Sequence, residues 1–214
     1  MPLASPASLA KLALFAALSA TMACSKPKPI TDTFVDDFER PQIGEDYHNT
    51  GGPYRIEAGK LRVKGAFNKP LWLRRPLPRN AEIEFDVKSD SRAGDIKIEA
   101  WGDGKTFATH KGAYLSSSYV FILGGWGNAI SALCRLDEHG KDRLERRDLK
   151  VKPGQTYHFK IRRKGKRVEW FIDGKAFLAL DDSAPLEGDH HNYLGFNNWD
   201  SDITFDNLKI RAIK

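Results

Sequence analysis

Short extended segments follow one another along almost the whole chain, and this pattern limits the possible fold more than any other feature. From Asp32 onward, apolar residues recur at every second position, as in "AEIEFDVKS", and turn residues separate the runs. Side chains of a β-strand point alternately to opposite faces, so such runs predict strands with one packed face. The period of an amphipathic helix is almost absent. We therefore expect an all-β chain.

Turn residues join several of these runs as hairpins. The stretch "YRIEAGKLRVKG" predicts a hairpin around Ala58-Gly59, and Asp173-Gly174 joins two strands in "RVEWFIDGKAFLALDD". Asp-Gly is among the strongest short hairpin signals. About a dozen short strands over roughly 180 residues are typical of two antiparallel sheets packed face to face. We predict one domain over residues 32–214, a two-sheet antiparallel β-sandwich of jelly-roll type.

The beginning of the chain has a different composition. Residues 1–31 contain no Asp or Glu, and the apolar run "LALFAALSATMA" precedes Cys24. This run has the length of a signal peptide and is too short to span a bilayer. Ala23-Cys24 resembles the lipoprotein signal of bacteria, in which a cysteine after a small residue is acylated. The resemblance implies a signal peptide over 1–23, lipidation at Cys24 and a tether over 24–31.

That resemblance also predicts where the protein resides. A lipidated Cys24 would hold the domain at a membrane of the bacterial cell envelope. Ser25 follows the cysteine, and in the enteric sorting rule this favours the outer membrane. A conventionally cleaved, secreted protein is the alternative.

Charge and cysteine content exclude several classes of function. The formal net charge is +6, spread over many segments, and no zinc finger, helix-turn-helix or RNA-binding motif is present, so we expect no nucleic-acid partner. Without Lys11, the one charged side chain of the signal, the charge is +5.

Cys134 shares an apolar face with Ala132, which predicts a small buried residue. No metal-ligand spacing is recognisable, so we expect no cofactor, with structural calcium as the remaining alternative.

Three segments resemble a known superfamily. They are "DDFERPQIGEDYHNTGGPYRIEAGKLRVKG", "YHFKIRRKGKRVEWFIDGKAF" and "LGFNNWDSDITFDNLKI". In this order they resemble the concanavalin A-like lectin/glucanase superfamily, in particular its laminin G-like members and 3-keto-disaccharide hydrolase domains. The resemblance covers most of residues 32–211 and implies the sandwich fold. Lectins, glycosidases, lyases and spacer domains share that fold, so the activity stays open.

An acidic row occupies one face of the strand predicted over 81–89. Glu82, Glu84 and Asp86 alternate there with three apolar residues. β-Glucanases of the superfamily carry a similar acidic trio, and retaining hydrolysis needs two carboxyl groups about 5–5.5 Å apart. The order and size of the acids depart from that trio. We expect a solvated face paired across strands with Lys97 and Glu99, and keep the trio as the catalytic candidates of an enzyme.

Tryptophans outside the predicted core are the candidate ligand contacts. Trp101 shares a predicted polar strand face with Lys97 and Glu99, whereas Trp126 and Trp199 lie in "GGWGN" and "FNNWDSD". The C–H face of a pyranose packs on an aromatic ring, and nearby amides and carboxylates can bind its hydroxyls. The predicted carbohydrate site comprises Trp101, Trp126, Trp199, Asn197, Asn198 and Asp200. The alternative for each ring is that it covers an edge or end of the sandwich.

Together these features predict a cell-envelope lipoprotein whose lectin-like domain binds carbohydrate without catalysis. One alternative is a glycoside hydrolase or lyase that acts on polysaccharides or 3-keto-glycosides. A second alternative is a structural or adhesion module that binds another envelope protein through a sheet surface. The identity of the ligand does not follow from the sequence.

Overall fold

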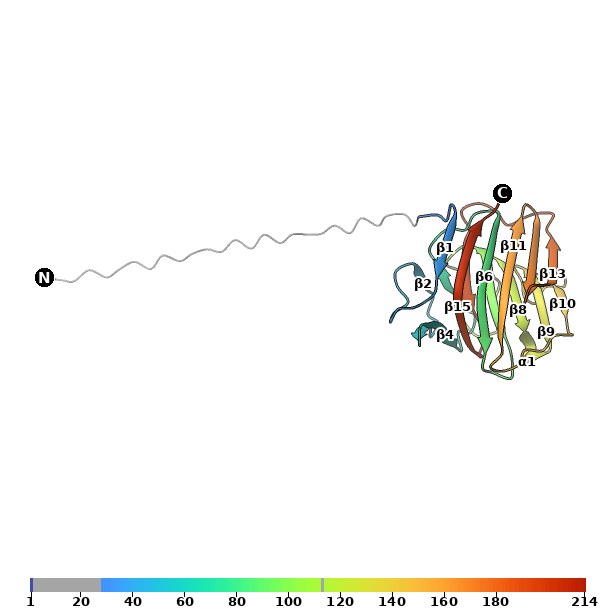
Figure 1. Ribbon diagram of the computed structural model, residues 1–214, viewed down its shortest axis with the longest axis horizontal. Helices are drawn as coiled ribbons and strands as arrows, with labels where there is room; N and C mark the ends of the chain where they lie inside the picture. Colours follow the sequence, from blue (N-terminus) through green and yellow to red (C-terminus); the bar gives the residue numbers. More distant parts are fainter. Residues whose placement is uncertain (2–27, 113) are drawn as a thin grey trace.

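The chain folds into two antiparallel β-sheets packed face to face, as predicted (Figure 1). A computed structural model describes Met1, residues 28–112 and residues 114–214. The predicted signal peptide, Cys24 and most of the tether lie outside these residues. In the described part, no helix is long and apolar enough to cross a membrane.

The first sheet has eight strands in the order β13-β12-β11-β6-β15-β4-β3, and β1 also pairs with β15. Its strand β15 runs past β1, β4 and β6, so one long strand organises half of the sheet. The bounds are β1 Thr33–Asp36, β3 Arg55–Glu57, β4 Lys60–Lys64, β6 Ala81–Ser89, β11 Thr156–Lys164, β12 Arg167–Ile172, β13 Lys175–Asp181 and β15 Asp202–Ala212.

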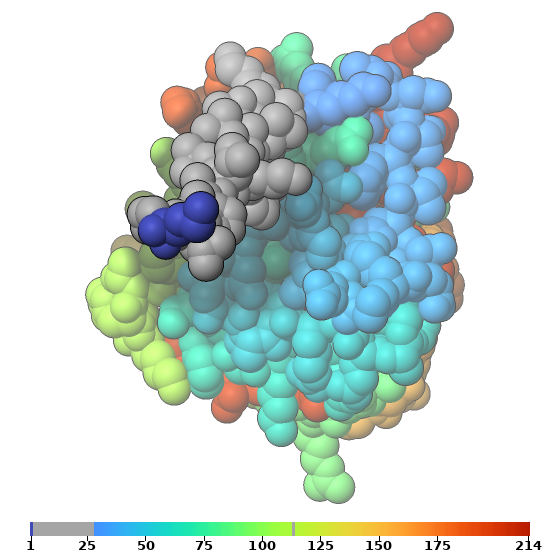
Figure 2. All heavy atoms as spheres, turned by 90° about the vertical axis from the view of Figure 1, so that its left-hand side faces the viewer, coloured from blue at the N-terminus to red at the C-terminus, as the bar shows by residue number. Residues whose placement is uncertain are grey.

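The second sheet has seven strands in the order β10-β9-β8-β7-β14-β5-β2. A single helical turn, α1, joins β8 to β9. The bounds are β2 Tyr47–Asn49, β5 Leu71–Leu73, β7 Ile96–Gly102, β8 Tyr119–Gly124, α1 Gly125–Asn128, β9 Ile130–Arg135, β10 Leu144–Arg146 and β14 Tyr193–Asn197. The side of the molecule seen in Figure 2 is formed largely by the segment from β1 to β5, in blue and cyan.

Alternation along the strands places the core between the sheets. On β6, Ile83, Phe85 and Val87 are at most 1% exposed, because they point toward the second sheet. Strand β8 is buried along its whole length, as its apolar character on both faces predicted. Its outward-facing residues Val120 and Ile122 pack against Ala132 and Cys134 in a separate small cluster.

The predicted turns are confirmed. Ala58-Gly59 and Asp173-Gly174 join β3 to β4 and β12 to β13, and all four residues have positive φ, as in the tight hairpin turns that Gly and Asp favour. Cys134 is buried and unpaired, as expected, and burial raises the pKa of its thiol to about 12.

The prediction that Trp101 lies on a polar strand face is wrong. The register between β7 and β14 shifts beside it, because Ala100 pairs with Leu194 and Gly102 pairs with Tyr193. Trp101 is the extra residue of this β-bulge, with φ 58°, and its side chain turns into the core, where it is completely buried. Its indole Nε1–H donates to the Pro78 carbonyl at 3.1 Å. A bulge inverts the alternation that placed it outside.

Candidate functional site

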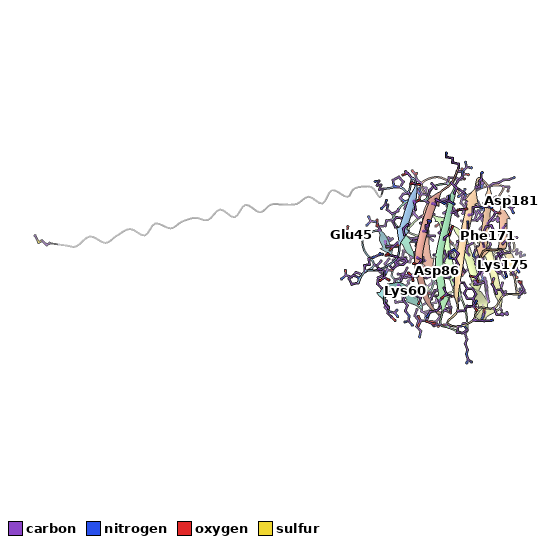
Figure 3. The ribbon with its side chains drawn as sticks, viewed as in Figure 1. Glu45, Lys60, Asp86, Phe171, Lys175 and Asp181 are labelled. Atoms are coloured by element: carbon purple, nitrogen blue, oxygen red, sulfur yellow. The ribbon has the colours of Figure 1, made fainter. Side chains whose placement is uncertain are left out.

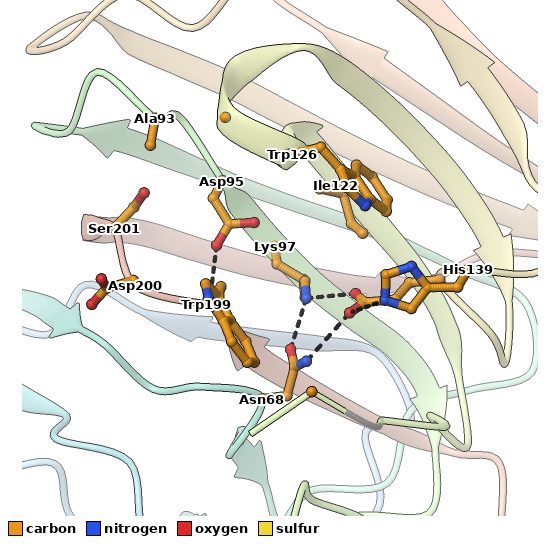
Figure 4. A pocket seen from close by; sticks show the side chains of 14 residues that line it. Asn68, Ala93, Asp95, Lys97, Ile122, Trp126, His139, Trp199, Asp200 and Ser201 are labelled. Carbon is orange, nitrogen blue, oxygen red and sulfur yellow. Dashed lines mark hydrogen bonds and ion pairs between the residues drawn. The ribbon is translucent and has the colours of Figure 1, made fainter. Parts of the chain in front are cut away.

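A pocket of about 440 Å³ opens on the outer face of the second sheet. Lys97 of β7 and Ile122 of β8 form its floor, since both alternate with core residues on their strands. Loops that are far apart in the sequence form its walls. They contribute Asn68, Asp95, Trp126, Glu138, His139 and Trp199 (Figure 4).

Trp126 stands on one side of this pocket, on a strained turn. Its φ and ψ are 52° and 52°, in the left-handed region that a bulky side chain rarely adopts. Asn128 holds the turn, because its side chain donates to the Val151 carbonyl at 2.8 Å and accepts from the Val151 N–H at 2.9 Å. The indole is 37% exposed, and the Arg143 guanidinium lies 4.7 Å from its ring centre. The ring is therefore fixed and still accessible.

Trp199 stands on the other side, with Lys97 between the two rings (Figure 4). Its backbone N–H donates to Asp95 Oδ2, and its carbonyl accepts from the Phe67 N–H at 2.9 Å. The Phe67 ring packs edge-on against the indole at a centroid distance of 5.2 Å. The two indoles thus form opposite walls of one pocket.

The floor between the indoles is a buried ion pair. Lys97 is 2% exposed and Glu138 is 7% exposed, and 2.5 Å separates Lys97 Nζ from Glu138 Oε2. Lys97 also donates to Asn68 Oδ1 at 2.7 Å. Burial by itself lowers the pKa of Lys97, but the carboxylates of Glu138 and Asp95 outweigh it and raise this pKa above its usual value. Lys97 therefore remains charged and paired.

A second buried carboxylate lies beside the floor, on the same outer face of β7 as Lys97. Glu99 accepts hydrogen bonds from Tyr114 at 2.8 Å, Ser118 at 2.9 Å and Asn197 at 2.7 Å, and a further one from Ser116. Burial raises the pKa of Glu99 even though these donors lower it. This network holds the floor in place from one side, since fully satisfied buried polar groups make a structure rigid.

Three of the eleven described non-glycine residues with positive φ line this pocket. They are Asn68, Asp95 and Trp126, with φ angles of 59°, 60° and 52°. Asn and Asp tolerate this region, whereas a bulky residue such as Trp126 is an outlier there and costs about 1–3 kcal/mol. The clearest backbone strain at the pocket is therefore at one of its two aromatic walls.

The predicted carbohydrate-site residues divide into three groups. Trp126, Trp199 and Asp200 line the pocket, and Asn197 is buried beside its floor, opposite Lys97 across the strands and bonded to Glu99. Asn198 is completely buried, and its side chain accepts from the Ala66 N–H and donates to the Ser201 carbonyl, so its amide is used within the protein. The bulge in β7 removes Trp101 from the site altogether.

Several pocket residues were not anticipated. Asn68, Glu138 and His139 lie in loops without any motif, and no pattern in the sequence signals them. Lys97 was expected on a polar strand face, and it is on the outer face but buried there by the loops. The alternating Asp95, Lys97 and Glu99 were the available signal, because charges at every second position share a face.

The acidic row lies on the other sheet, away from the pocket (Figure 3). Its predicted cross-strand pairing with Lys97 and Glu99 is wrong, because β6 pairs with β11 and β15 and not with β7. Glu82 contacts Arg211, and its carboxylate lies 3.4 Å from Lys160. Asp86 lies 2.9 Å from His158.

These partners account for the row without catalysis. Burial opposes the shift, yet Arg211 and Lys160 lower the pKa of Glu82, and His158 and Asn207 lower that of Asp86. A general acid needs a raised pKa, so both shifts run against that role. Glu84 lies 3.6 Å from both Lys160 and His158. The acidic row therefore forms ion pairs with basic residues on the outer surface of the first sheet.

Within the described residues, no group of three or more His, Cys, Asp or Glu side chains is arranged to hold a metal ion.

Comparisons with known proteins agree with the fold. No protein-family model matches the chain. An extracellular exo-alpha-L-arabinofuranosidase from Streptomyces chartreusis is 23% identical over 141 residues, which are 65% of this chain and 16% of that enzyme. The chain thus spans about a sixth of the length of that relative.

Solved structures with the same fold include two carbohydrate-binding proteins. The carbohydrate-binding module CBM66 from Bacillus subtilis has a TM-score of 0.63 and 14% identity, over 80% of this chain and 98% of that one. The carbohydrate recognition domain of Emp47p has a TM-score of 0.62 and 9% identity, over 85% and 95%. A sialidase matches with a TM-score of 0.61 and 14% identity, over 87% of this chain and 19% of its own. At these identities the similarity establishes the β-sandwich fold.

Proposed function

We propose that this domain binds carbohydrate in the pocket between Trp126 and Trp199 and is carried on a lipoprotein of the bacterial cell envelope. The observation that carries the proposal is two fixed indoles on opposite sides of a polar floor. A pocket of about 440 Å³ falls within the range of about 300–1,000 Å³ typical of small-ligand sites. One or two sugar rings are ligands of suitable size.

The chemistry of the walls suits a saccharide. The apolar C–H face of a pyranose packs on an indole, while its hydroxyls need donors and acceptors at the edge of the ring. Asp95 and His139 supply such groups between the two indoles, whereas the buried amide of Asn68 is used by Lys97 and Glu138. Because the turn of Trp126 and the backbone of Trp199 are held by hydrogen bonds, little ordering would accompany binding, and preformed sites bind more tightly for that reason.

The names of the structural neighbours support the same proposal. A carbohydrate-binding module and a carbohydrate recognition domain match this chain over nearly their whole length. The arabinofuranosidase matches over a small part of its length, as a domain within a longer enzyme would. A non-catalytic binding role is consistent with all three.

The position of the pocket fits attachment through Cys24. The chain enters the fold at Thr33, which pairs with Arg211 near the end of β15, whereas Asp200 and Ser201 line the pocket just before β15 begins. A strand of 11 residues spans roughly 35 Å at about 3.3 Å per residue. Figure 1 shows the entry and α1 near opposite ends of the sandwich. An acylated Cys24 would therefore leave the pocket facing away from the membrane.

The test is a glycan array followed by calorimetry on the best ligand with Trp126→Ala and Trp199→Ala. We expect each variant to lose about five- to thirtyfold in affinity, since stacking on one ring contributes on the order of 1–2 kcal/mol. Phe171→Ala is the matched control, because Phe171 is a half-buried aromatic residue on the outer face of the other sheet (Figure 3). The absence of saccharide binding, or tryptophan variants that behave like the control, would refute the proposal.

Lipidation has its own measurement. Mass spectrometry of the protein from a bacterial envelope fraction should show an acylated N-terminal cysteine at position 24. Replacement of Cys24 by Ser should release the protein from the membrane fraction. Retention of the Cys24→Ser variant in the membrane would contradict the anchor.

A hydrolase that uses the same pocket is the second candidate. One observation favours it: burial, together with the nearby Glu138 and Asp200, raises the pKa of Asp95, although Lys97 and the Trp199 N–H lower it. A carboxyl group with a raised pKa in a pocket is typical of a general acid. Release of reducing sugar from a polysaccharide panel, abolished by Asp95→Asn, would establish hydrolysis. Binding without product release would leave the non-catalytic role.

A further inference from the structure

The charges that line the pocket do not balance. Asp95, Glu138 and Asp200 bring three carboxyl groups to it, and Lys97 brings one ammonium group. The His139 imidazole lies at its rim, 3.8 Å from the Glu138 carboxylate. Because Glu138 and Lys97 neutralise each other at 2.5 Å, Asp95 and Asp200 leave the lining with an excess of negative charge.

The charge of Lys97 is already balanced by Glu138. Lys97 is 2% exposed, and two of its three N–H donors are directed at Glu138 and at Asn68 Oδ1, the latter at 2.7 Å. Turning the whole ammonium toward an anionic ligand would leave a buried carboxylate unpaired, which is strongly unfavourable. An acidic sugar would therefore meet carboxylates and no available ammonium group.

The neighbouring cations are also engaged outside the pocket. The guanidinium of Arg143 packs on the Trp126 ring and donates to Glu145 Oε1 at 2.6 Å and to the Glu138 carbonyl at 2.9 Å. The Lys111 ammonium lies 3.7 Å from the centre of the Phe67 ring. Neither Arg143 nor Lys111 is among the residues that line the pocket.

Asp95 presents a free acceptor to the pocket. Its Oδ2 accepts from the Trp199 N–H, and among the described residues no donor contacts its Oδ1. The carboxylate is fixed, because the Asp95 N–H donates to the Gly124 carbonyl at 2.8 Å, and φ is 60°. In Figure 4 the free oxygen points toward the space between Trp126 and Lys97.

Asp200 adds a second negative charge beside Trp199. It is exposed, and it makes no hydrogen bond or ion pair with any residue that the structure describes. Two carboxylates next to two indoles are a suitable environment for a cation, because the faces of aromatic rings attract positive charge as well.

We propose that the pocket selects saccharides that carry a free amine, such as glucosamine residues, over N-acetylated and acidic saccharides, an inference that rests on the proposed carbohydrate function. The ammonium group of the sugar would occupy the space beside Asp95 Oδ1, while the C–H face of its ring packs on an indole and the exposed Asp200 adds negative charge to the pocket from the far side of Trp199. An N-acetyl group offers no charge in that place, and a uronic acid would place like charges together.

The test is calorimetry of the intact domain with three β-1,4-linked or α-1,4-linked tetramers. They are fully deacetylated glucosamine, N-acetylglucosamine and galacturonic acid, at low salt and about pH 6, where an amine of this kind is protonated. We expect the glucosamine tetramer to bind at least about tenfold more tightly than its N-acetylated form, and the galacturonate tetramer not to bind. Added salt should weaken the first interaction because it screens charge.

Variants at the two aspartates test whether their carboxylates cause the selection of the amine. Asp95→Asn keeps an oxygen for the Trp199 N–H, so the turn should persist while the charge is lost. We expect Asp95→Asn to reduce glucosamine-tetramer affinity about tenfold and Asp200→Asn to reduce it several-fold, and we expect each variant to lower the preference for the glucosamine tetramer over the N-acetylated tetramer. Asp189→Asn, at an exposed aspartate outside the pocket, is the matched control and should change neither. If Asp95→Asn fails to fold, exposed Asp200 still tests the proposal.

The outcomes separate this inference from the proposed function. If the N-acetylated or the galacturonate tetramer binds as tightly as the glucosamine tetramer, and Trp126→Ala weakens that binding, charge selection is refuted and carbohydrate binding stands. If Asp95→Asn and Asp200→Asn both leave glucosamine affinity unchanged, charge selection is refuted as well. If no saccharide binds at all, both proposals fail.

Discussion

Replacement of Lys97 by Met tests the buried floor of the pocket most directly. Methionine fills nearly the same space as the lysine stem, so the change removes the charge without a large cavity. Glu138, 7% exposed, would lose the ammonium group 2.5 Å away and keep one long hydrogen bond of 3.3 Å from Asn68. Breaking a buried pair in this way costs about 3–5 kcal/mol.

A second estimate gives a similar magnitude. The unpaired Glu138 carboxylate can take up a proton instead of remaining charged. At pH 7, protonation of a carboxyl group with an ordinary pKa near 4.3 costs about 1.36 kcal/mol for each pH unit, or roughly 3.7 kcal/mol. We therefore expect Lys97→Met to reduce the free energy of unfolding by about 3–4 kcal/mol. For a domain of this size that corresponds to a fall in Tm of roughly 6–16 °C.

The pH dependence distinguishes this cause from general damage. In the variant, burial without a partner disfavours only the charged form of the carboxylate, so stability is lost as the pH rises and the carboxylate has to ionise. The deficit relative to the unmodified protein should be about 3–4 kcal/mol at pH 7 and shrink to roughly 1 kcal/mol or less near pH 4.5. Urea unfolding at both pH values, followed by tryptophan fluorescence, measures it.

Two further variants serve as controls. Lys97→Met combined with Glu138→Gln removes both charges and should recover all but about 1 kcal/mol. Lys88→Met breaks an ion pair with Asp90 at 3.1 Å in which both side chains are about one-third exposed, and it should cost less than about 1 kcal/mol. A Lys97→Met deficit below about 1 kcal/mol at pH 7, or one that is equally large at pH 4.5, would refute the argument.

Three other predictions concern strain, acid stability and thiol reactivity. The free energy of unfolding, measured with urea, should be about 1 kcal/mol larger for Trp126→Gly than for Trp126→Ala, because glycine adopts a φ of 52° without strain. Equal free energies would show that the turn is unstrained. Burial opposes ionisation of Asp36, but its bonds from Arg40 and Tyr47 lower its pKa below 3.8, so its contribution to stability is present above about pH 4 and lost as the pH falls through the lower folded-state pKa. Asp36→Asn should therefore cost stability at pH 7 and lessen the loss in acid; an unchanged acid titration of stability would contradict this. In a Cys24→Ser variant, Cys134, with a thiol pKa of about 12, should not react with a thiol reagent at pH 8 until urea unfolds the domain, and rapid reaction of the folded protein would show that Cys134 is accessible.

Local patterns in the sequence were sufficient for the fold class and for many strands. The face shared by Ile83, Phe85 and Val87 is the core face because side-chain direction in a strand depends only on position parity. The turn at Asp173-Gly174 followed from the positive φ that these two residues tolerate. The core face and the turn both depend on residues that are close together in the chain, so the sequence alone was sufficient to predict them.

The candidate site was predicted in part. Trp126, Trp199 and Asp200 were predicted as site residues because a saccharide site needs an aromatic ring next to groups that can hydrogen-bond hydroxyls. Trp101 was misplaced because one extra residue in a β-bulge turns its side chain to the opposite face, and the bulge arises from how β7 pairs with β14. Register between strands distant in the sequence is not visible in either strand alone.

By itself, the sequence determined two antiparallel layers, the tight hairpin turns and the side of most strands that faces inward, because each depends on residues a few positions apart. The tertiary structure decided which outward-facing residues remain exposed to solvent. It buried Lys97 and Glu99 under loops, gave the acidic row its partners on β11 and β15, and brought Trp126 and Trp199 to one pocket. These outcomes depend on the packing of segments that are remote along the chain. The burial of a side chain, its ion-pair partners and the shape of the pocket are defined only when those segments are packed together.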